Sequence, residues 1–141
     1  MTEISVRRKV EFSETDMAGL VHFSNFFKYV EYAESALFSK MNCALINTSS
    51  DGASGWPRSK IDCSFKSPLR FQDEIIITLS IQELKQKSIV YTFKIHKLEN
   101  DDKTLAAKGS MTTVYVKKFN NNDKLEPLDL PKEITSLKTN S

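Results

Sequence analysis

One long helical pattern stands among segments that alternate like strands, and this combination constrains the fold most. Apolar residues recur from Phe26 to Met41 at spacings of 4, 3, 4 and 4, which is the period of one helix face. We therefore predict a helix of about four turns that begins near Ser24 and buries one broad face. A single helix with so long an apolar face needs a sheet to cover it.

Five other segments show the period of two that is typical of half-buried strands. They span residues 4–12, 60–66, 74–84, 88–98 and 103–116. Short polar turns separate the last three, which favours a meander of antiparallel strands. Residues 47–55 are dense in small polar residues and glycine, and we predict a loop there. The order of elements predicts an α+β fold, in which a twisted five-stranded antiparallel sheet wraps the one long helix.

The length of 141 residues suits one domain with a single core. We assign this domain to residues 1–118 and a C-terminal extension, with a short helix after Pro131, to residues 119–141. The net charge of +2 is too small to favour nucleic acid as a partner. No apolar run approaches the roughly 20 residues that cross a membrane, and the first residues lack the apolar core of a signal peptide. We therefore expect a cytoplasmic protein without a membrane partner.

Cysteine and histidine are scarce in this chain. Cys43 and Cys63 are the only cysteines, and His22 and His96 are the only histidines. These residues are too few and too scattered for a disulfide framework or a metal cluster. We expect reduced thiols and chemistry that needs neither a metal nor another cofactor.

The stretch from Glu14 to Val30, ETDMAGLVHFSNFFKYV, places a lone carboxylate just before the predicted helix. Asp16 lies in a short loop, and Gly19 allows that loop to turn tightly. Backbone N–H groups at a helix start have no intrahelical partner and lie at the positive end of the helix dipole. A carboxylate beside such donors is the minimum equipment for attack on an ester or thioester carbonyl. From the loop alone, an Asx turn that caps local backbone is the commoner role for Asp16.

Asp16 is followed by glycine at the third position after it, by Leu20-Val21, by His22-Phe23, and by Ser24 and Asn25. This pattern resembles the 4-hydroxybenzoyl-CoA thioesterase-like family of hotdog-fold acyl-CoA thioesterases. A second segment, with Pro68 in a bend before Glu74, is similar to that family as well. The resemblance covers residues 4–116. It implies a hotdog fold, hydrolysis of an acyl- or aroyl-CoA to the free acid and CoA, and a site between the subunits of a homodimer or homotetramer.

The resemblance also implies roles for the residues of the motif. Asp16 would act as the nucleophile or as a general base on water, and the sequence leaves both routes open. Backbone N–H groups near His22, Phe23 or Ser24 would bind the oxyanion. Many members carry a histidine seven residues after the aspartate, but that position is Phe23 here. The backbone-amide version is therefore expected, with His22 either assisting the leaving thiolate or filling an aromatic position.

Candidate substrate-binding residues lie on the helix and around the bend between strands. Coenzyme A carries phosphates, which Lys and Arg bind well. The candidates are Ser24, Asn25, Glu31, Lys60, Lys66 and Arg70. Each has a structural alternative: Asn25 could cap the helix, Glu31 could face solvent or a subunit interface, and the cations could form a solvated basic face.

Two other functions are compatible with this fold. A hotdog dehydratase would need a histidine and an acidic partner in a differently placed motif, which this chain lacks. A noncatalytic acyl-thioester-binding protein, with Asp16 purely structural, is the main alternative to an enzyme. The acyl group, the choice between CoA and acyl carrier protein, and the choice between dimer and tetramer do not follow from the sequence.

Overall fold

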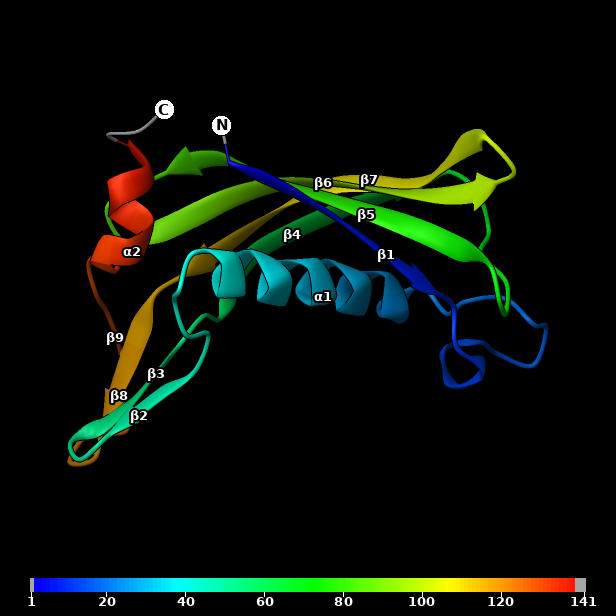
Figure 1. The fold of residues 1–141 in the computed structure, drawn as a ribbon. Coiled ribbons are helices and arrows are strands. Elements are labelled where there is room, and N and C mark those ends of the chain that lie inside the picture. Colours follow the sequence, from blue (N-terminus) through cyan, green and yellow to red (C-terminus); the bar gives the residue numbers. More distant parts are fainter. Residues whose placement is uncertain (1, 139–141) are drawn as a thin grey trace.

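The computed structural model describes residues 2–138 of the chain, and Figure 1 shows their arrangement. The N-terminal half contains β1 (Glu3–Lys9), the 3-10 helix η1 (Phe12–Glu14), α1 (Ser24–Lys40), β2 (Asn47–Ser49), β3 (Gly52–Gly55) and β4 (Arg58–Phe65). The C-terminal half contains β5 (Glu74–Leu84), β6 (Ser88–Glu99), β7 (Asp102–Val114), β8 (Val116–Phe119), β9 (Leu125–Pro127), α2 (Lys132–Thr135) and the 3-10 helix η2 (Ser136–Lys138).

A five-stranded antiparallel sheet forms the body of the molecule, with its strands in the order β1-β5-β6-β7-β4. β5, β6 and β7 are consecutive antiparallel neighbours, as the short turns between them predict. α1 lies along one face of this twisted sheet (Figure 1). The predicted α+β architecture, one long helix against a five-stranded antiparallel sheet, is therefore confirmed.

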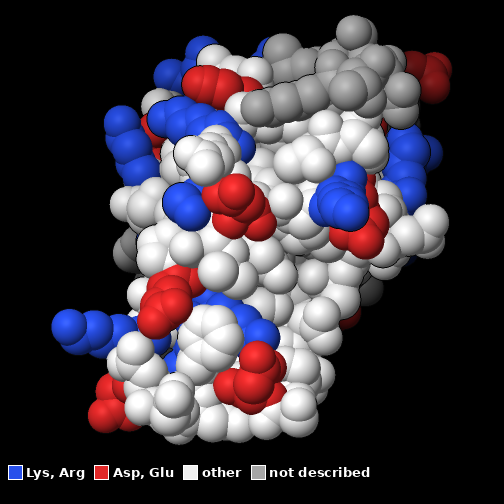
Figure 2. All heavy atoms as spheres, turned by 90° about the vertical axis from the view of Figure 1, so that its left-hand side faces the viewer, with Lys and Arg blue, Asp and Glu red and all other residues white. Residues whose placement is uncertain are grey.

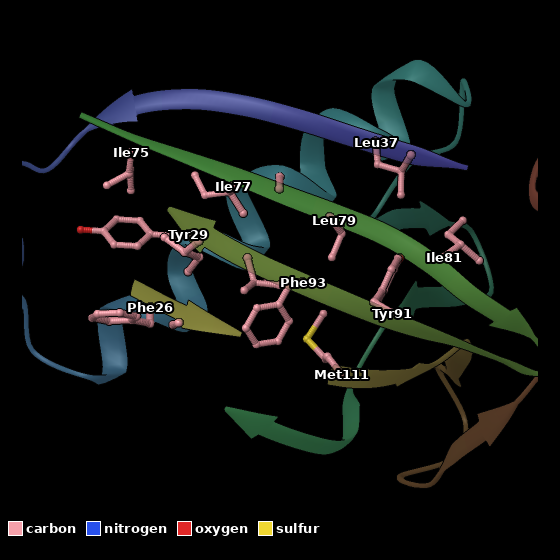
Figure 3. Packing of buried hydrophobic residues seen from close by; sticks show 14 of the residues in the cluster. Phe26, Tyr29, Leu37, Ile75, Ile77, Leu79, Ile81, Tyr91, Phe93 and Met111 are labelled. Carbon is pink, nitrogen blue, oxygen red and sulfur yellow. The ribbon is translucent and has the colours of Figure 1, made fainter. Parts of the chain in front are cut away.

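The core lies between α1 and the sheet, where the apolar face of the helix packs against the apolar face of the strands. Phe26, Tyr29 and Leu37 come from α1, and Ile77 and Leu79 come from β5 (Figure 3). Each of these side chains is at most 3% exposed. Burying a side chain of this size stabilises the fold by roughly 1.5–3 kcal/mol. Packing on the sheet, rather than helix propensity, therefore supplies most of the stability of α1.

Residues 47–55 differ from the prediction, because they form a hairpin rather than an irregular loop. β2 pairs with β3, and β3 pairs with β8 in a second sheet of order β2-β3-β8-β9. Gly52 lies so close to β8 that an added Cβ atom would collide with the Lys118 carbonyl. The side chains of this hairpin are small and polar, so they show no hydrophobic pattern that would predict strands. Main-chain pairing with the distant β8 holds the strands in place.

β1 and β4 also differ in extent from the predicted strands. β1 ends at Lys9 rather than at Phe12, because residues 12–14 turn into η1. β4 begins at Arg58, two residues before Lys60. The bounds of β5 agree with the prediction, since strict alternation of buried and solvent-facing side chains runs through most of that strand.

The C-terminal segment returns to the main sheet. α2 is the short helix predicted after Pro131, and Leu130 and Ile134 are buried in the core cluster. The Leu130 N–H donates to the Gln86 carbonyl at 3.0 Å. Figure 2 shows the end of the molecule that carries this segment and the second sheet, and acidic and basic side chains are interspersed there.

Candidate active site

A short loop before α1 holds Asp16 with its side chain at the surface. Its Oδ1 atom accepts hydrogen bonds from the N–H groups of Ala18 at 2.8 Å and Leu20 at 3.2 Å. Gly19 lies in this turn with φ of +79°, a left-handed conformation that glycine adopts without strain. Within residues 2–138, Oδ2 of Asp16 has no hydrogen-bond partner. The carboxylate is therefore anchored through one oxygen and open at the other.

Glu14 ties the Asp16 loop to both β1 and α1. Its carboxylate accepts hydrogen bonds from the Arg8 guanidinium at 2.6 Å and from the Tyr29 hydroxyl at 2.9 Å. Its carbonyl accepts from the His22 N–H at 3.2 Å and from the Asn25 side-chain amide at 2.8 Å. Burial, together with the hydrogen bond to Glu14, raises the pKa of the Tyr29 hydroxyl, so Tyr29 stays protonated as a donor. These contacts set the position of the loop relative to the helix start.

The start of α1 leaves one backbone donor unpaired close to this loop in sequence. The Ser24 N–H donates to the His22 imidazole at 3.3 Å, and the Asn25 N–H donates to the His22 carbonyl at 2.9 Å. The His22 N–H is engaged by Glu14. In the part of the chain that the structure describes, the Phe23 N–H has no partner. It precedes the first turn of α1, at the positive end of the dipole, where negative charge is stabilised.

The side chains of His22, Ser24 and Asn25 make contacts within the turn itself. The His22 Nδ1 atom lies 2.8 Å from the Ser24 hydroxyl oxygen, and the His22 ring lies 4.6 Å from the Phe23 ring. His22 and Ser24 are exposed, whereas Asn25 is buried. Asn25 secures the loop through Glu14, and the N-cap residue of α1 is Phe23, whose side chain makes no capping hydrogen bond.

A groove of about 330 Å³ opens beside the helix start. Its lining consists of Val21, Phe23, Phe26, Phe65, Lys66, Ser67 and Pro68. The Phe65 ring meets the Phe26 ring edge-to-face at 5.1 Å and the Phe23 ring at 6.4 Å. Phe23 is 58% exposed and Phe65 is 47% exposed, so aromatic surface faces the opening. This groove could hold an apolar group next to the Phe23 N–H.

Phe65 was not among the site residues predicted from the sequence. Its alternation with Ile61 and Cys63 on the helix-facing side of β4 indicates a core position. One sequence feature could have identified Phe65 as a site residue: it is the last residue of β4 and directly precedes the polar bend that carries Lys66. Glu14 was also missed, because its partners Arg8 and Tyr29 lie on different elements.

The predicted phosphate-binding cations occupy different places. Lys66 lines the aromatic groove. Arg70 lies beside the Asp16 loop, because its main chain forms a β-bridge with Leu20. Lys60 alternates with the helix-facing Ile61, so it lies on the opposite face of the sheet. The structure therefore brings Lys66 and Arg70 near the helix start and leaves Lys60 away from it.

Glu31 lies on α1 and is engaged by β4. Its carboxylate accepts a hydrogen bond from the Arg58 guanidinium at 3.2 Å. Arg58 also binds the buried carboxylate of Glu34 at 2.6 Å. Glu31 is thus part of a helix-to-strand ion pair, away from the residues that line the groove.

Residues 2–138 contain neither a candidate membrane-spanning helix nor a candidate metal-binding cluster. Within residues 2–138, no helix is long and apolar enough to cross a membrane. The same residues contain no group of three or more His, Cys, Asp or Glu side chains arranged to hold a metal ion.

Comparison with known proteins identifies similar sequences. Residues 10–136 match the sequence model of a family described as the thioesterase-like superfamily. The chain is 24% identical over 139 residues to the 4-hydroxybenzoyl-CoA thioesterase of Pseudomonas sp. (strain CBS-3), covering 95% of this chain and 96% of the relative. It is 30% identical over 102 residues to the 1,4-dihydroxy-2-naphthoyl-CoA hydrolase of Prochlorococcus marinus (strain NATL2A), covering 67% and 65%.

Solved structures share the fold. The chain superposes on the 4-hydroxybenzoyl-CoA thioesterase of Pseudomonas sp. strain CBS-3 with a TM-score of 0.80 and 21% identity, covering 96% of this chain and 98% of the other. It superposes on Slr0204, a 1,4-dihydroxy-2-naphthoyl-CoA thioesterase from Synechocystis, with a TM-score of 0.81 and 20% identity, covering 96% and 94%. These likenesses extend over nearly the whole chain.

Proposed function

The chain belongs to the thioesterase-like superfamily, and on that premise we propose that it hydrolyses the thioester of an acyl- or aroyl-CoA. Membership confirms the resemblance that the Asp16 motif indicated in the sequence. The proposal rests on the position of two chemical groups, one on each side of the turn into α1. Among residues 2–138, one carboxylate oxygen of Asp16 and the N–H of Phe23 have no hydrogen-bond partner, and these two groups flank the turn that leads into α1. An aromatic groove adjoins Phe23.

In the proposed reaction, the Phe23 N–H donates a hydrogen bond to the thioester carbonyl oxygen. Negative charge grows on that oxygen as the carbonyl is attacked, and the dipole of α1 stabilises it further. Asp16 either takes a proton from the attacking water or attacks the carbonyl itself. The C–S bond breaks, and CoA leaves as a thiolate that takes up a proton. If water is the nucleophile, the free acid forms directly; if Asp16 is the nucleophile, water then hydrolyses the mixed anhydride on Asp16, which releases the free acid and restores the carboxylate.

The groove and its rim suggest how the two ends of the substrate are held. The rings of Phe23, Phe26 and Phe65 suit a flat aromatic or short acyl group, because rings favour edge-to-face contact with other rings. Lys66 and Arg70 are the proposed partners of the CoA phosphates, since both lie near the helix start.

A second copy of the chain is proposed to complete this site. β4 is an edge strand of the sheet, and its free main-chain groups favour pairing with another strand. Its helix-facing side leaves Ile61 38% exposed and Phe65 47% exposed. Pairing of β4 with β4 of a second copy would cover this apolar surface and close the open side of the groove, giving a homodimer as the smallest active unit.

The test is the Asp16→Asn variant against a broad panel of acyl- and aroyl-CoA thioesters. Asn keeps the hydrogen bonds that Oδ1 accepts from Ala18 and Leu20, but it is neither a base nor a carboxylate nucleophile. We expect kcat/KM to fall by about 10²–10⁴. Asp101→Asn, in the exposed turn between β6 and β7, is the matched control and should keep full activity.

The results separate the activity from the assignment of the site. If the wild-type protein hydrolyses nothing in the panel but binds a nonhydrolysable acyl-CoA analogue, the protein is the noncatalytic binder. If the wild type is active and Asp16→Asn is equally active, the hydrolase assignment stands and Asp16 is not its base or nucleophile.

A further inference from the structure

The face of the main sheet opposite α1 is polar and contains its own hollow. α1 covers one face of this sheet, and the other is open along most of its length (Figure 1). The hollow has a volume of about 660 Å³. Serine, threonine, lysine and histidine side chains supply most of its lining, and the aromatic groove at the helix start shares none of them.

The strand register arranges these side chains in rows across the sheet. One row runs through Ser5, Thr78, Lys94, Lys108 and Ser64. The next row runs through Glu3, Ser80, Thr92, Ser110 and Asp62. The first row therefore has two cations at its centre with hydroxyl groups on either side, while the second has its two acids at the ends.

The two central lysines face each other without a counter-charge. Lys94 and Lys108 are directly opposite on β6 and β7, and within residues 2–138 neither forms an ion pair with a carboxylate. Like charges in this arrangement destabilise a sheet. The two acids at the ends of the second row also line the hollow, but each is bound by a serine of its own row: Glu3 accepts from Ser80 at 2.6 Å, and Asp62 accepts from Ser110 at 2.5 Å.

A third lysine adds to the positive charge of the hollow, whereas the histidine in its lining does not. Lys103 lies on its lining and, like the central pair, has no carboxylate partner in the described part of the chain. Burial, followed by the charges of Lys103 and Lys94, lowers the pKa of His96. The imidazole is therefore neutral near pH 7, and the lysines carry the charge of this surface.

We propose that this hollow binds a phosphate-bearing small molecule, with Lys94 and Lys108 as its charge partners and the Ser64 hydroxyl beside Lys108 as a further donor. An anion between the two lysines would relieve their repulsion, and ammonium and hydroxyl groups are suitable donors to phosphate oxygens. A second protein copy fits less well, because stable interfaces need an apolar centre and the two central rows of this face are polar. Its apolar side chains lie beyond these rows, with Ile76, Leu98 and Leu105 toward one end and Val90 and Val114 toward the other. The site lies on the opposite face from the aromatic groove and does not depend on the proposed hydrolysis.

Pyrophosphate is the probe, because its two phosphate groups can contact both lysines. Isothermal titration of the full chain with pyrophosphate, with sodium chloride added to hold ionic strength constant, should show saturable binding. The Lys94→Gln/Lys108→Gln double variant should weaken the Kd at least tenfold. The matched control is Lys118→Gln/Lys124→Gln, which removes two exposed charges from the second sheet and its loop, and it should bind like the wild type.

Two results would overturn the proposal: the absence of saturable binding to the wild type, and equal weakening in the control variant. If pyrophosphate does not bind the wild type and Lys94→Gln/Lys108→Gln changes the oligomeric mass by light scattering, the face is a subunit contact instead. If the double variant does not fold, 15N–1H spectra of the wild type decide. Shifts on adding pyrophosphate must cluster on β6 and β7, and shifts elsewhere contradict the site.

Discussion

At the scale of single residues, Glu14 does more for the candidate site than its position in the sequence suggests. It is a positioning residue, because its carboxylate and its carbonyl together hold β1, the Asp16 loop and the helix start in one arrangement. A hydrogen bond to a charged group contributes roughly 1.5–3 kcal/mol. Loss of the Glu14 charge should therefore loosen the loop without removing any atom that touches substrate.

Glu14→Gln should lower kcat more than it raises KM and should lower the melting temperature. Gln keeps the size of the side chain but loses the ion pair with Arg8. Steady-state kinetics and thermal unfolding measure the two effects. Glu11→Gln is the matched control, because the Glu11 side chain is 71% exposed and reaches Arg8 only at 3.9 Å. Equal effects of the two substitutions would rule out a special role for Glu14.

The Cys63 thiol should react slowly at the pH of a thiol-release assay. Burial, followed by the charge of Asp62, raises the pKa of Cys63 to about 11. Because the thiolate is the reactive form, alkylation at pH 8 should be on the order of a hundredfold slower than for free cysteine. The rate should rise with pH toward 11. Iodoacetamide labelling followed by mass spectrometry measures it, and a rate that levels off near the free-cysteine pKa would contradict the expectation.

At the scale of elements, an ion pair joins α1 to the start of β4. Arg58 donates to both carboxylate oxygens of Glu34, at 2.6 and 3.0 Å. The Glu34 side chain is 1% exposed and that of Arg58 is 24% exposed. Arg58 also donates to the Thr113 hydroxyl at 2.9 Å. This cluster holds the edge strand against the helix at the end opposite the aromatic groove.

Arg58→Met should destabilise the protein by about 3–5 kcal/mol, because it leaves the Glu34 carboxylate buried without its partner. Denaturant unfolding measures the free energy. Glu31→Gln removes the other carboxylate that Arg58 binds, but the Glu31 side chain is 59% exposed, so we expect a loss below about 1 kcal/mol. If the two variants lose equal stability, burial of Glu34 does not set the strength of this contact.

At the scale of the whole molecule, the proposed dimer determines whether the site is complete. Ile61→Glu places a charge on the apolar side of β4, where the side chain is 38% exposed. We expect the variant to be monomeric by light scattering and to lose thioesterase activity. Leu125→Glu makes the same chemical change on β9, where the side chain is 55% exposed, and it should leave mass and activity unchanged. A dimeric Ile61→Glu protein would contradict pairing through β4.

The order of residues alone determined the elements whose signal is local. The alternation of Ile75, Ile77, Leu79 and Ile81 predicts β5, and the stripe from Phe26 to Leu37 predicts α1, because each periodicity reflects burial on one face. The motif around Asp16 pointed to the family for the same reason, since its residues are neighbours in the chain. These features need no knowledge of what packs against them.

Contacts between residues far apart in sequence could be identified only from the folded chain. The hairpin at residues 47–55 exists because β3 meets the main chain of β8. Phe65 reaches the groove, and Glu14 reaches Tyr29, through the packing of separate elements. The open face gathers Lys94 and Lys108 through strand register. Pairing and register depend on the whole sheet, so no local pattern could place these groups together.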